Sequence, residues 1–285
     1  MQPAEFLETA YQYLIENDIR RSFYLAGQRF VVRTYAGQQE NKRGYDLEVC
    51  AYVPLFLQLK VSHFHPAFSK ASVVAARKRN GITDNPGCYA FSLHPDKKSN
   101  QYRQHNLLAD LHARGCYARY IAPLFHTESD LEHFKYSLRA PYWGPSAMGF
   151  WDDGWFGWRN YLSFDHSISI LPHKQISDPT TTPHQYTYST KNLVCFHSEA
   201  ERIENGKRFL SSIDEELSRA ASGEPMSLMD INERIANSLR LFEDTAQAIN
   251  IEIEKRQTPT RRFYFLAKLL KRRYKVDCVL VAKRG

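Results

Sequence analysis

Four polar side chains between Asp46 and Lys60 have types and spacings that suit chemistry on a phosphate ester. Gln58 and Lys60 alternate with leucines, so a strand of period two places both on one face and the leucines on the other. Asp46 and Glu48 are also two residues apart and share a face in the same way. We therefore expect carboxylates to face an amide and an ammonium across adjacent strands.

Such a set of groups would serve metal-assisted hydrolysis of a phosphodiester. A divalent cation, Mg²⁺ or Mn²⁺, neutralises the phosphate charge and lowers the pKa of a bound water. Asp46 and Glu48 are the expected carboxylate ligands, and the backbone carbonyl of Leu59 would point into the same site. Gln58 supplies a neutral oxygen where an acid would otherwise stand, and Lys60 orients the water or stabilises the charged phosphorus centre.

The spacing of Asp46, eleven residues, then Gln58-Leu59-Lys60 resembles the PD-(D/E)XK nucleases, in particular Mrr-like restriction enzymes and resolvases whose second acid is glutamine. The resemblance covers residues 1–125, with Tyr45 where the family has a proline. Related enzymes often add a glutamate from the N-terminal helix, which indicates Glu8. The resemblance implies a metal-dependent DNA endonuclease, of the kind found in prokaryotic restriction or anti-phage defence systems. The alternative is a catalytically inactive protein on the same scaffold that binds nucleic acid or a protein partner.

Hydrophobic patterning predicts the elements that must position these groups. Residues 52–54 are expected to bend the chain between the strand of Asp46 and the strand of Gln58. Around them we predict a helix over about residues 3–18, a hairpin of 23–25 with 30–32, a strand over 88–93, a helix over 103–114 and a strand over 116–121. Strand, helix and strand with short connections indicate a crossover unit. The predicted fold class is α/β (α+β), a restriction-endonuclease-like mixed sheet flanked by helices.

Residues 126–198 are predicted to form an aromatic-rich β extension of that core. Short strands are expected at 167–171, 185–188 and 193–196. Residues 142–164 hold all four tryptophans of the chain. Such a cluster serves either core and interface packing or stacking on nucleotide bases, and both uses stay open.

Residues 199–285 are predicted to form a helical, basic C-terminal region. Residues 255–285 contain eleven lysines and arginines and one acid, Asp277, so this segment carries +10 and the rest of the chain, at +7 overall, about −3. Such density is typical of contacts to a phosphate backbone, although a solvated helix face gives the same pattern. The expected DNA-binding residues are Arg261, Arg262, Lys271, Arg272 and Arg273. The amphipathic helices before them could pair with another chain, as a homo-oligomer or with a partner subunit.

Composition sets further limits on the class of protein. The 285 residues contain no apolar run near the ~18 that span a bilayer, and the N-terminus lacks a secretory signal pattern. The five cysteines are well separated and form no CxxC pair, so we expect buried free thiols, a reducing compartment and a cytoplasmic location.

Overall fold

The computed structural model describes residues 1–25, 30–34, 49–95, 101–137, 166–177, 184–197, 201–203, 206–222, 226–242, 246–256 and 258–284. Its larger sheet has six strands in the order β1-β11-β2-β5-β6-β10. They are β1 (Phe30–Thr34), β2 (Val49–Leu59), β5 (Tyr117–Pro123), β6 (Ser167–Ile170), β10 (Lys207–Arg208) and β11 (Asp277–Arg284). β2 and β5 are parallel, and the other pairs are antiparallel. The predicted mixed sheet is confirmed.

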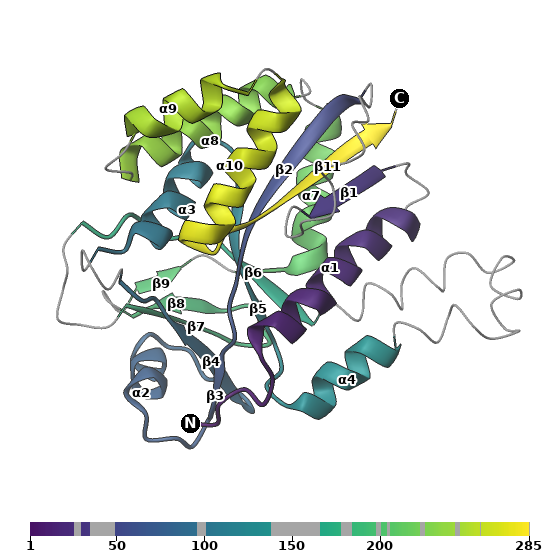
Figure 1. The fold of residues 1–285 in the computed structure, drawn as a ribbon. Coiled ribbons are helices and arrows are strands. Elements are labelled where there is room, and N and C mark those ends of the chain that lie inside the picture. Colours follow the sequence, from purple (N-terminus) through teal and green to yellow (C-terminus); the bar gives the residue numbers. More distant parts are fainter. Residues whose placement is uncertain are drawn as a thin grey trace, which may run out of the picture.

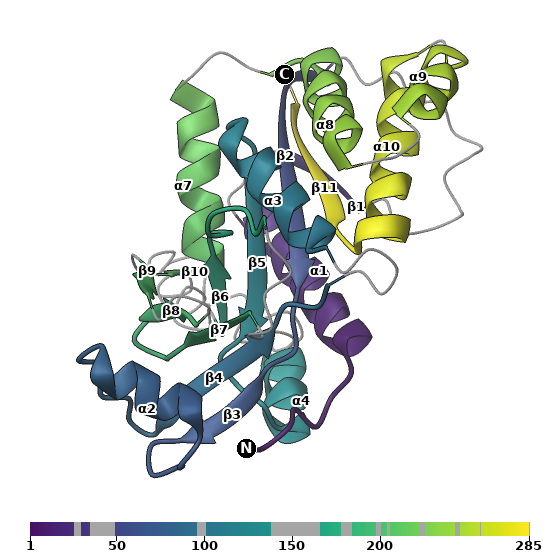
Figure 2. The ribbon, with the colours of Figure 1, turned by 90° about the vertical axis from the view of Figure 1, so that its left-hand side faces the viewer.

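A second, antiparallel sheet has five strands in the order β3-β4-β7-β8-β9. They are β3 (His63–Pro66), β4 (Gly87–Ser92), β7 (Gln185–Tyr188), β8 (Val194–Phe196) and β9 (Glu201–Ile203). Helix α2 (Ser72–Arg79) lies at its outer end, away from the larger sheet (Figure 2). The strands predicted at 185–188 and 193–196 are thus confirmed, and they lie in the same sheet as β3 and β4.

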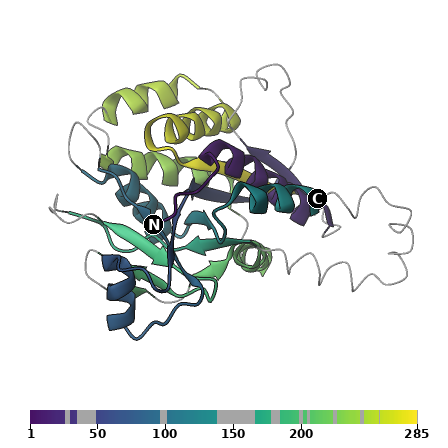
Figure 3. The ribbon, with the colours of Figure 1, turned by 90° about the horizontal axis from the view of Figure 1, so that it is seen from below.

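Helices cover both faces of the larger sheet (Figure 1). On one side lie α3 (Arg103–Ala113), α8 (Leu228–Phe242), α9 (Ala246–Glu254) and α10 (Pro259–Tyr274). On the other lie α1 (Glu8–Leu25), α4 (Glu128–Ser137) and α7 (Phe209–Ser222), with α4 alongside α1 (Figure 3). None of the described helices combines the length and apolar composition that crossing a bilayer requires.

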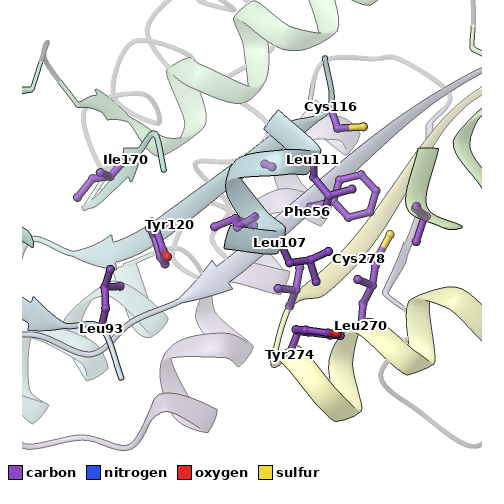
Figure 4. Packing of buried hydrophobic residues seen from close by; sticks show 14 of the residues in the cluster. Phe56, Leu93, Leu107, Leu111, Cys116, Tyr120, Ile170, Leu270, Tyr274 and Cys278 are labelled. Atoms are coloured by element: carbon purple, nitrogen blue, oxygen red, sulfur yellow. The ribbon is translucent and has the colours of Figure 1, made fainter. Parts of the chain in front are cut away.

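The side chains of β2 alternate between two hydrophobic cores. Phe56 packs in the core beneath α3, α8 and α10, together with Tyr120, Leu107 and Leu270 (Figure 4). Leu55, Leu57 and Leu59 belong to the other core, beneath α1 and α7. This alternation follows directly from the period-two pattern of the sequence.

The bend predicted at residues 52–54 is wrong, because residues 49–59 form one continuous strand. Pro54 is tolerated inside it because β5 pairs with β2 only from Leu55 onward. Lys60 donates its N–H to β5, so the N–H groups of even-numbered residues face that side, where Pro54 has no partner strand to bond.

The N-terminal helix is displaced from its predicted range of 3–18. The backbone N–H groups of Gln2 and Glu5 bond to Phe64 and His126, which holds the first residues extended. α1 then continues to Leu25, so the strand predicted at 23–25 is wrong and the apolar stripe extends through Ile19.

The C-terminal segment completes the larger sheet. Thr258 caps α10 by accepting a bond from the Arg261 N–H, with Pro259 at the first helical position, as the sequence indicates. β11 then inserts between β1 and β2. The larger sheet therefore takes strands from all three of the predicted regions 1–125, 126–198 and 199–285.

Candidate functional site

Asp46 and Glu48, the predicted metal ligands, lie outside the described residues, before the first residue of β2. β2 runs straight on from Val49 to Leu59, which at about 3.3 Å per residue separates its two ends by roughly 33 Å. Gln58, Leu59 and Lys60 are at the far end. The bend that was expected to bring the acids and Lys60 together is therefore absent from the strand.

Gln58 and Lys60 do share a face at the carboxyl end of β2. Gln58 pairs with Tyr120 of β5, and the Lys60 ammonium lies over the Tyr120 ring, 5.9 Å from its centroid. The Gln58 side chain is 2 % exposed, and its Oε1 has no hydrogen-bond partner among the described residues. A buried acceptor without a donor is costly, which marks this position as one that a water or a ligand could complete.

The Lys60 ammonium is held in a poorly solvated place. Burial lowers the pKa of Lys60 to about 8, and the opposite charge of Glu8, at the start of α1, limits the decrease. Lys60 and Glu8 are therefore within electrostatic range of each other, although they are far apart in sequence. A lysine of this pKa can hold a proton at neutral pH and still release one, which ordinary surface lysines do not.

The Leu59 carbonyl points away from Tyr120 and β5. The Lys60 N–H donates to the Ile121 carbonyl of β5 at 2.9 Å, and the Leu59 carbonyl belongs to the same trans peptide, so it points the opposite way. On that side lies β11, whose first residue, Asp277, pairs with Leu57. The acid facing this end of β2 from a neighbouring strand is therefore Asp277.

Asp277 lies in a corner between α1, β2 and α10, which we call the Asp277 corner. A pocket of about 10 Å³ is lined there by residues including Gln12, Glu16, Leu59, Lys271 and Asp277. Lys271 Nζ donates to Asp277 Oδ2 at 2.7 Å, and Gln12 Nε2 donates to Glu16 at 3.0 Å. Such a volume holds about one water or one small ion.

Burial raises the pKa of the Asp277 carboxyl, against the opposing effect of Lys271. Glu16 and Glu8 raise this pKa further through their negative charges. The negative charges of Asp277, Glu16 and Glu8 thus act on one another, and the one ammonium bonded to Asp277 is that of Lys271. A further cation would therefore be electrostatically favoured in this corner.

The donors of the Asp277 corner fit a hard divalent cation. No group of three or more His, Cys, Asp or Glu side chains within the described ranges could hold a metal by itself. Mg²⁺, however, is commonly bound through one or two carboxylates, with water and phosphate oxygens completing its six ligands. The Asp277 and Glu16 carboxylates and the Leu59 carbonyl are oxygens of that kind.

The predicted DNA-binding residues lie on or beside α10 and differ in availability. Arg261, Arg272 and Arg273 are exposed, and Arg262 is half-buried, with its Nε donating to the Arg256 carbonyl at 2.8 Å. Lys271 is committed to Asp277. The last turn of α10 leads into β11, so its basic side chains come directly before the Asp277 corner in the chain.

A chain of aspartate, histidine and serine in the interior was not predicted from the sequence. His166 Nε2 lies 3.1 Å from Asp18 Oδ2, and His166 Nδ1 lies 3.1 Å from Ser167 Oγ. The connectivity is that of a nucleophilic relay, but Ser167 is 1 % exposed and its Oγ accepts a bond from Tyr11. These groups tie α1 to β6 and satisfy each other's buried polar atoms.

Two further expectations concern aromatic and cysteine residues. The tryptophan-rich segment 142–164 lies outside the described residues.

The cysteines whose side chains the structure describes are buried free thiols, as predicted. They are Cys88, Cys116, Cys195 and Cys278.

Comparison of the chain with protein-family models, with curated proteins and with solved structures finds no match. The resemblance to PD-(D/E)XK nucleases therefore stays a prediction from the Gln58-Leu59-Lys60 motif and its surroundings.

Proposed function

We propose that the protein is a metal-dependent DNA endonuclease with a restriction-endonuclease-like core, whose metal ligands are Asp277, Glu16 and the Leu59 carbonyl. One observation carries the proposal: the Leu59 carbonyl and the Asp277 carboxylate lie on the same side of β2, and the charge of Glu8 acts on the pKa of both Asp277 and the desolvated Lys60. The proposal keeps the lysine and the carbonyl that the motif indicates and replaces Asp46 by an acid from the C-terminal strand.

Each group has a definite task in this proposal. A bound divalent cation would neutralise phosphate charge and acidify a water. The Lys60 ammonium, with its pKa of about 8, is mainly protonated at neutral pH and stabilises the negative charge that develops on the phosphate oxygens. The Gln58 Oε1, which has no hydrogen-bond partner among the described residues, would accept a hydrogen bond from a water on the face of β2 that it shares with Lys60. Glu8 keeps the Lys60 proton in place.

The basic side chains of α10 favour a nucleic acid as the substrate. Arg272, Arg273 and Lys275 are exposed at the end of the helix that leads to Asp277. Contacts from these cations to a phosphate backbone would place the polymer over the Asp277 corner. A role in prokaryotic restriction or phage defence is carried by the motif resemblance alone.

One observation favours the alternative of a non-catalytic nucleic-acid-binding protein. Lys271 already bonds Asp277 at 2.7 Å, which neutralises the carboxylate without a metal. In that case the corner is a structural ion pair that joins α10 to β11, and α10 still presents its basic residues to DNA.

The test is nicking of supercoiled plasmid by the full chain with Mg²⁺ or Mn²⁺. We expect Asp277→Asn to reduce the rate roughly 100-fold or more and Lys60→Met to do the same, since each removes a charge used in the transition state. Glu254→Gln, which removes an exposed acid of α9, is the matched control and should cut at the wild-type rate.

Wild-type cleavage by both Asp277→Asn and Lys60→Met would refute the proposed site. Tight DNA binding by the wild type, without cleavage and without binding of Mn²⁺ in calorimetry, would establish the non-catalytic alternative instead.

A further inference from the structure

A second pocket lies away from the Asp277 corner, where β5 begins. Its volume is about 440 Å³, within the range of small-molecule sites. It is enclosed by the end of α3 and its loop, by β5 and β6, and by one face of α7, which stands beside β6 (Figure 2). It shares no lining residue with the Asp277 corner.

Two ion pairs already form between residues that line this pocket. Lys207 is paired with Glu215, and Arg219 is paired with Glu216 along α7. Three cations, Arg119, Lys207 and Arg219, face only these two acids, which leaves a surplus of one positive charge on the walls. The surplus belongs to Arg119, because no carboxylate of the described residues lies within ion-pair distance of it.

The Arg119 guanidinium is held rigidly by one edge. Its Nη1 donates to His112 Nδ1 and to the Ala118 carbonyl, both at 3.1 Å, and its central carbon lies 4.9 Å from the centroid of the Tyr117 ring. Its Nε and Nη2 donate to no acceptor of the described residues. Burial lowers the pKa of Arg119, and the negative charges of Glu216 and Glu215 only limit this decrease.

In other arginines of this molecule, Nε and Nη2 bind the two oxygens of a carboxylate. Arg77 places Nε and Nη2 on the two oxygens of Asp84, at 2.5 and 2.9 Å. Arg114 uses the same pair of nitrogens for Asp110, and Arg219 uses them for Glu216. Nε and Nη2 form the fork that matches the two oxygens of a carboxylate or a phosphate.

We propose that this pocket binds a small organic anion, whose carboxylate or phosphate group is held by Nε and Nη2 of Arg119. The hydroxyls of Ser169 and Ser212 line the same pocket and supply neutral polar contacts, while Leu171 adds apolar surface. The surplus of one positive wall charge favours a ligand of a single net negative charge. The proposal does not depend on nuclease activity, because none of these residues belongs to the proposed catalytic site.

The experiment is calorimetric or NMR titration of the full chain with inorganic phosphate and, separately, with acetate. We expect saturable binding of one equivalent. Arg119→Gln should weaken it roughly 10- to 100-fold, because the charge-assisted bidentate hydrogen bonds can no longer form. Arg119→Lys keeps the charge but not the fork, and should abolish most of the affinity as well.

Arg219→Gln is the matched control, since it removes one positive charge from the same pocket at a guanidinium whose fork is already filled. It should change the affinity less than about threefold. Equal losses of affinity in Arg119→Gln and Arg219→Gln would show unspecific charge attraction and overturn the proposal, as would the absence of saturable binding of either anion. Stronger binding of phosphate than of acetate would identify a phosphate group, and the reverse a carboxylate. Unchanged far-UV circular dichroism of the variants checks that they are folded.

Discussion

Two acid–base pairs of this molecule, Arg77–Asp84 and Lys271–Asp277, differ in how completely their charges are satisfied. Arg77 is fully buried, grips both oxygens of Asp84, and also donates to Thr187 Oγ1 and the Leu193 carbonyl. Lys271 bonds one oxygen of Asp277, and the other accepts only a long hydrogen bond of 3.4 Å from Gln12, next to a pocket of about 10 Å³ and two further acids.

This difference indicates that Arg77–Asp84 is a structural ion pair, whereas in Lys271–Asp277 another cation could replace the ammonium. We call the second pair exchangeable for this reason. A guanidinium that fills a carboxylate from both sides leaves no oxygen for a ligand, so Arg77–Asp84 can only hold α2 to the second sheet. An ammonium is a point charge on a flexible stem, and it can be displaced by a cation of higher charge. Asp277 is therefore the better candidate for function.

Breaking the complete pair should have the largest effect. Arg77→Met leaves Asp84, which is 7 % exposed as a side chain, as a buried unpaired charge, and we expect a decrease of about 3–5 kcal/mol in the free energy of unfolding. Urea denaturation measures it. The double variant Arg77→Met/Asp84→Leu should recover much of the stability. A decrease below about 1 kcal/mol in the single variant would mean that the pair is not structurally important.

Breaking the exchangeable pair should affect chemistry more than stability. We expect Asp277→Asn to reduce metal-dependent nicking roughly 100-fold and Asp46→Asn to leave it within about threefold. The opposite ranking would restore Asp46, the acid that the motif indicates, and remove Asp277 from the site. Plasmid nicking at matched protein concentrations decides between the two.

The Lys60 ammonium gives a smaller effect that depends on pH. Its pKa of about 8 in the fold is lower than in the unfolded chain, near 10.4, so the unfolded state binds more protons between these values and wild-type stability rises with pH across that window. Lys60→Met removes the cost of burying the charge and should stabilise the protein by about 1–3 kcal/mol at pH 7.

The advantage of Lys60→Met over the wild type should shrink as the pH rises from 8 to 10, which denaturation at each pH can measure. Glu8→Gln removes the carboxylate that supports the proton and should lower the pKa of Lys60 further. A gain in stability that is the same at pH 7 and pH 10 would show that the ammonium carries no burial cost.

The weakest expected effect concerns α10. Reversing Arg272 and Arg273 to glutamate should weaken DNA binding for all sequences and flatten the slope of log K against log salt by about 0.9 for each phosphate that is no longer neutralised. Lys255→Glu, at an exposed position of the same basic segment, is the control. An unchanged salt slope would assign the charge of α10 to another role. Lys271 is unsuitable for such a reversal because it is bonded to Asp277.

Much of the fold could be predicted because it depends on local patterns. Thr258-Pro259 marks the start of α10, and the helix over 103–114 and the strand at 185–188 appear as expected. The predicted crossover from the strand at 88–93 to the strand at 116–121 is wrong, because β4 lies in the second sheet and β5 pairs in parallel with β2. The errors have local causes as well. Residues 23–25 have β-rich composition but extend α1, because its apolar stripe packs on the sheet through Ile19. Pro54 was expected in a bend, but it lies inside β2. Its lack of an N–H costs no hydrogen bond there, because β5 pairs with β2 only from Leu55 onward.

The sequence by itself determined that Gln58 and Lys60 lie on one face of a strand and the leucines on the other, because side chains alternate in any strand. It could not determine which acid lies beside the end of that strand. That choice was made by β11, which inserts beside β2 from the far end of the chain and brings Asp277 opposite Leu57. In the same way, the packing of α7 against β6 leaves Nε and Nη2 of Arg119 in a pocket without a carboxylate partner among the described residues. The same nitrogens of Arg77, Arg114 and Arg219 each bind a carboxylate. Strand pairing and the matching of charges are long-range events, and no spacing along the chain encodes them.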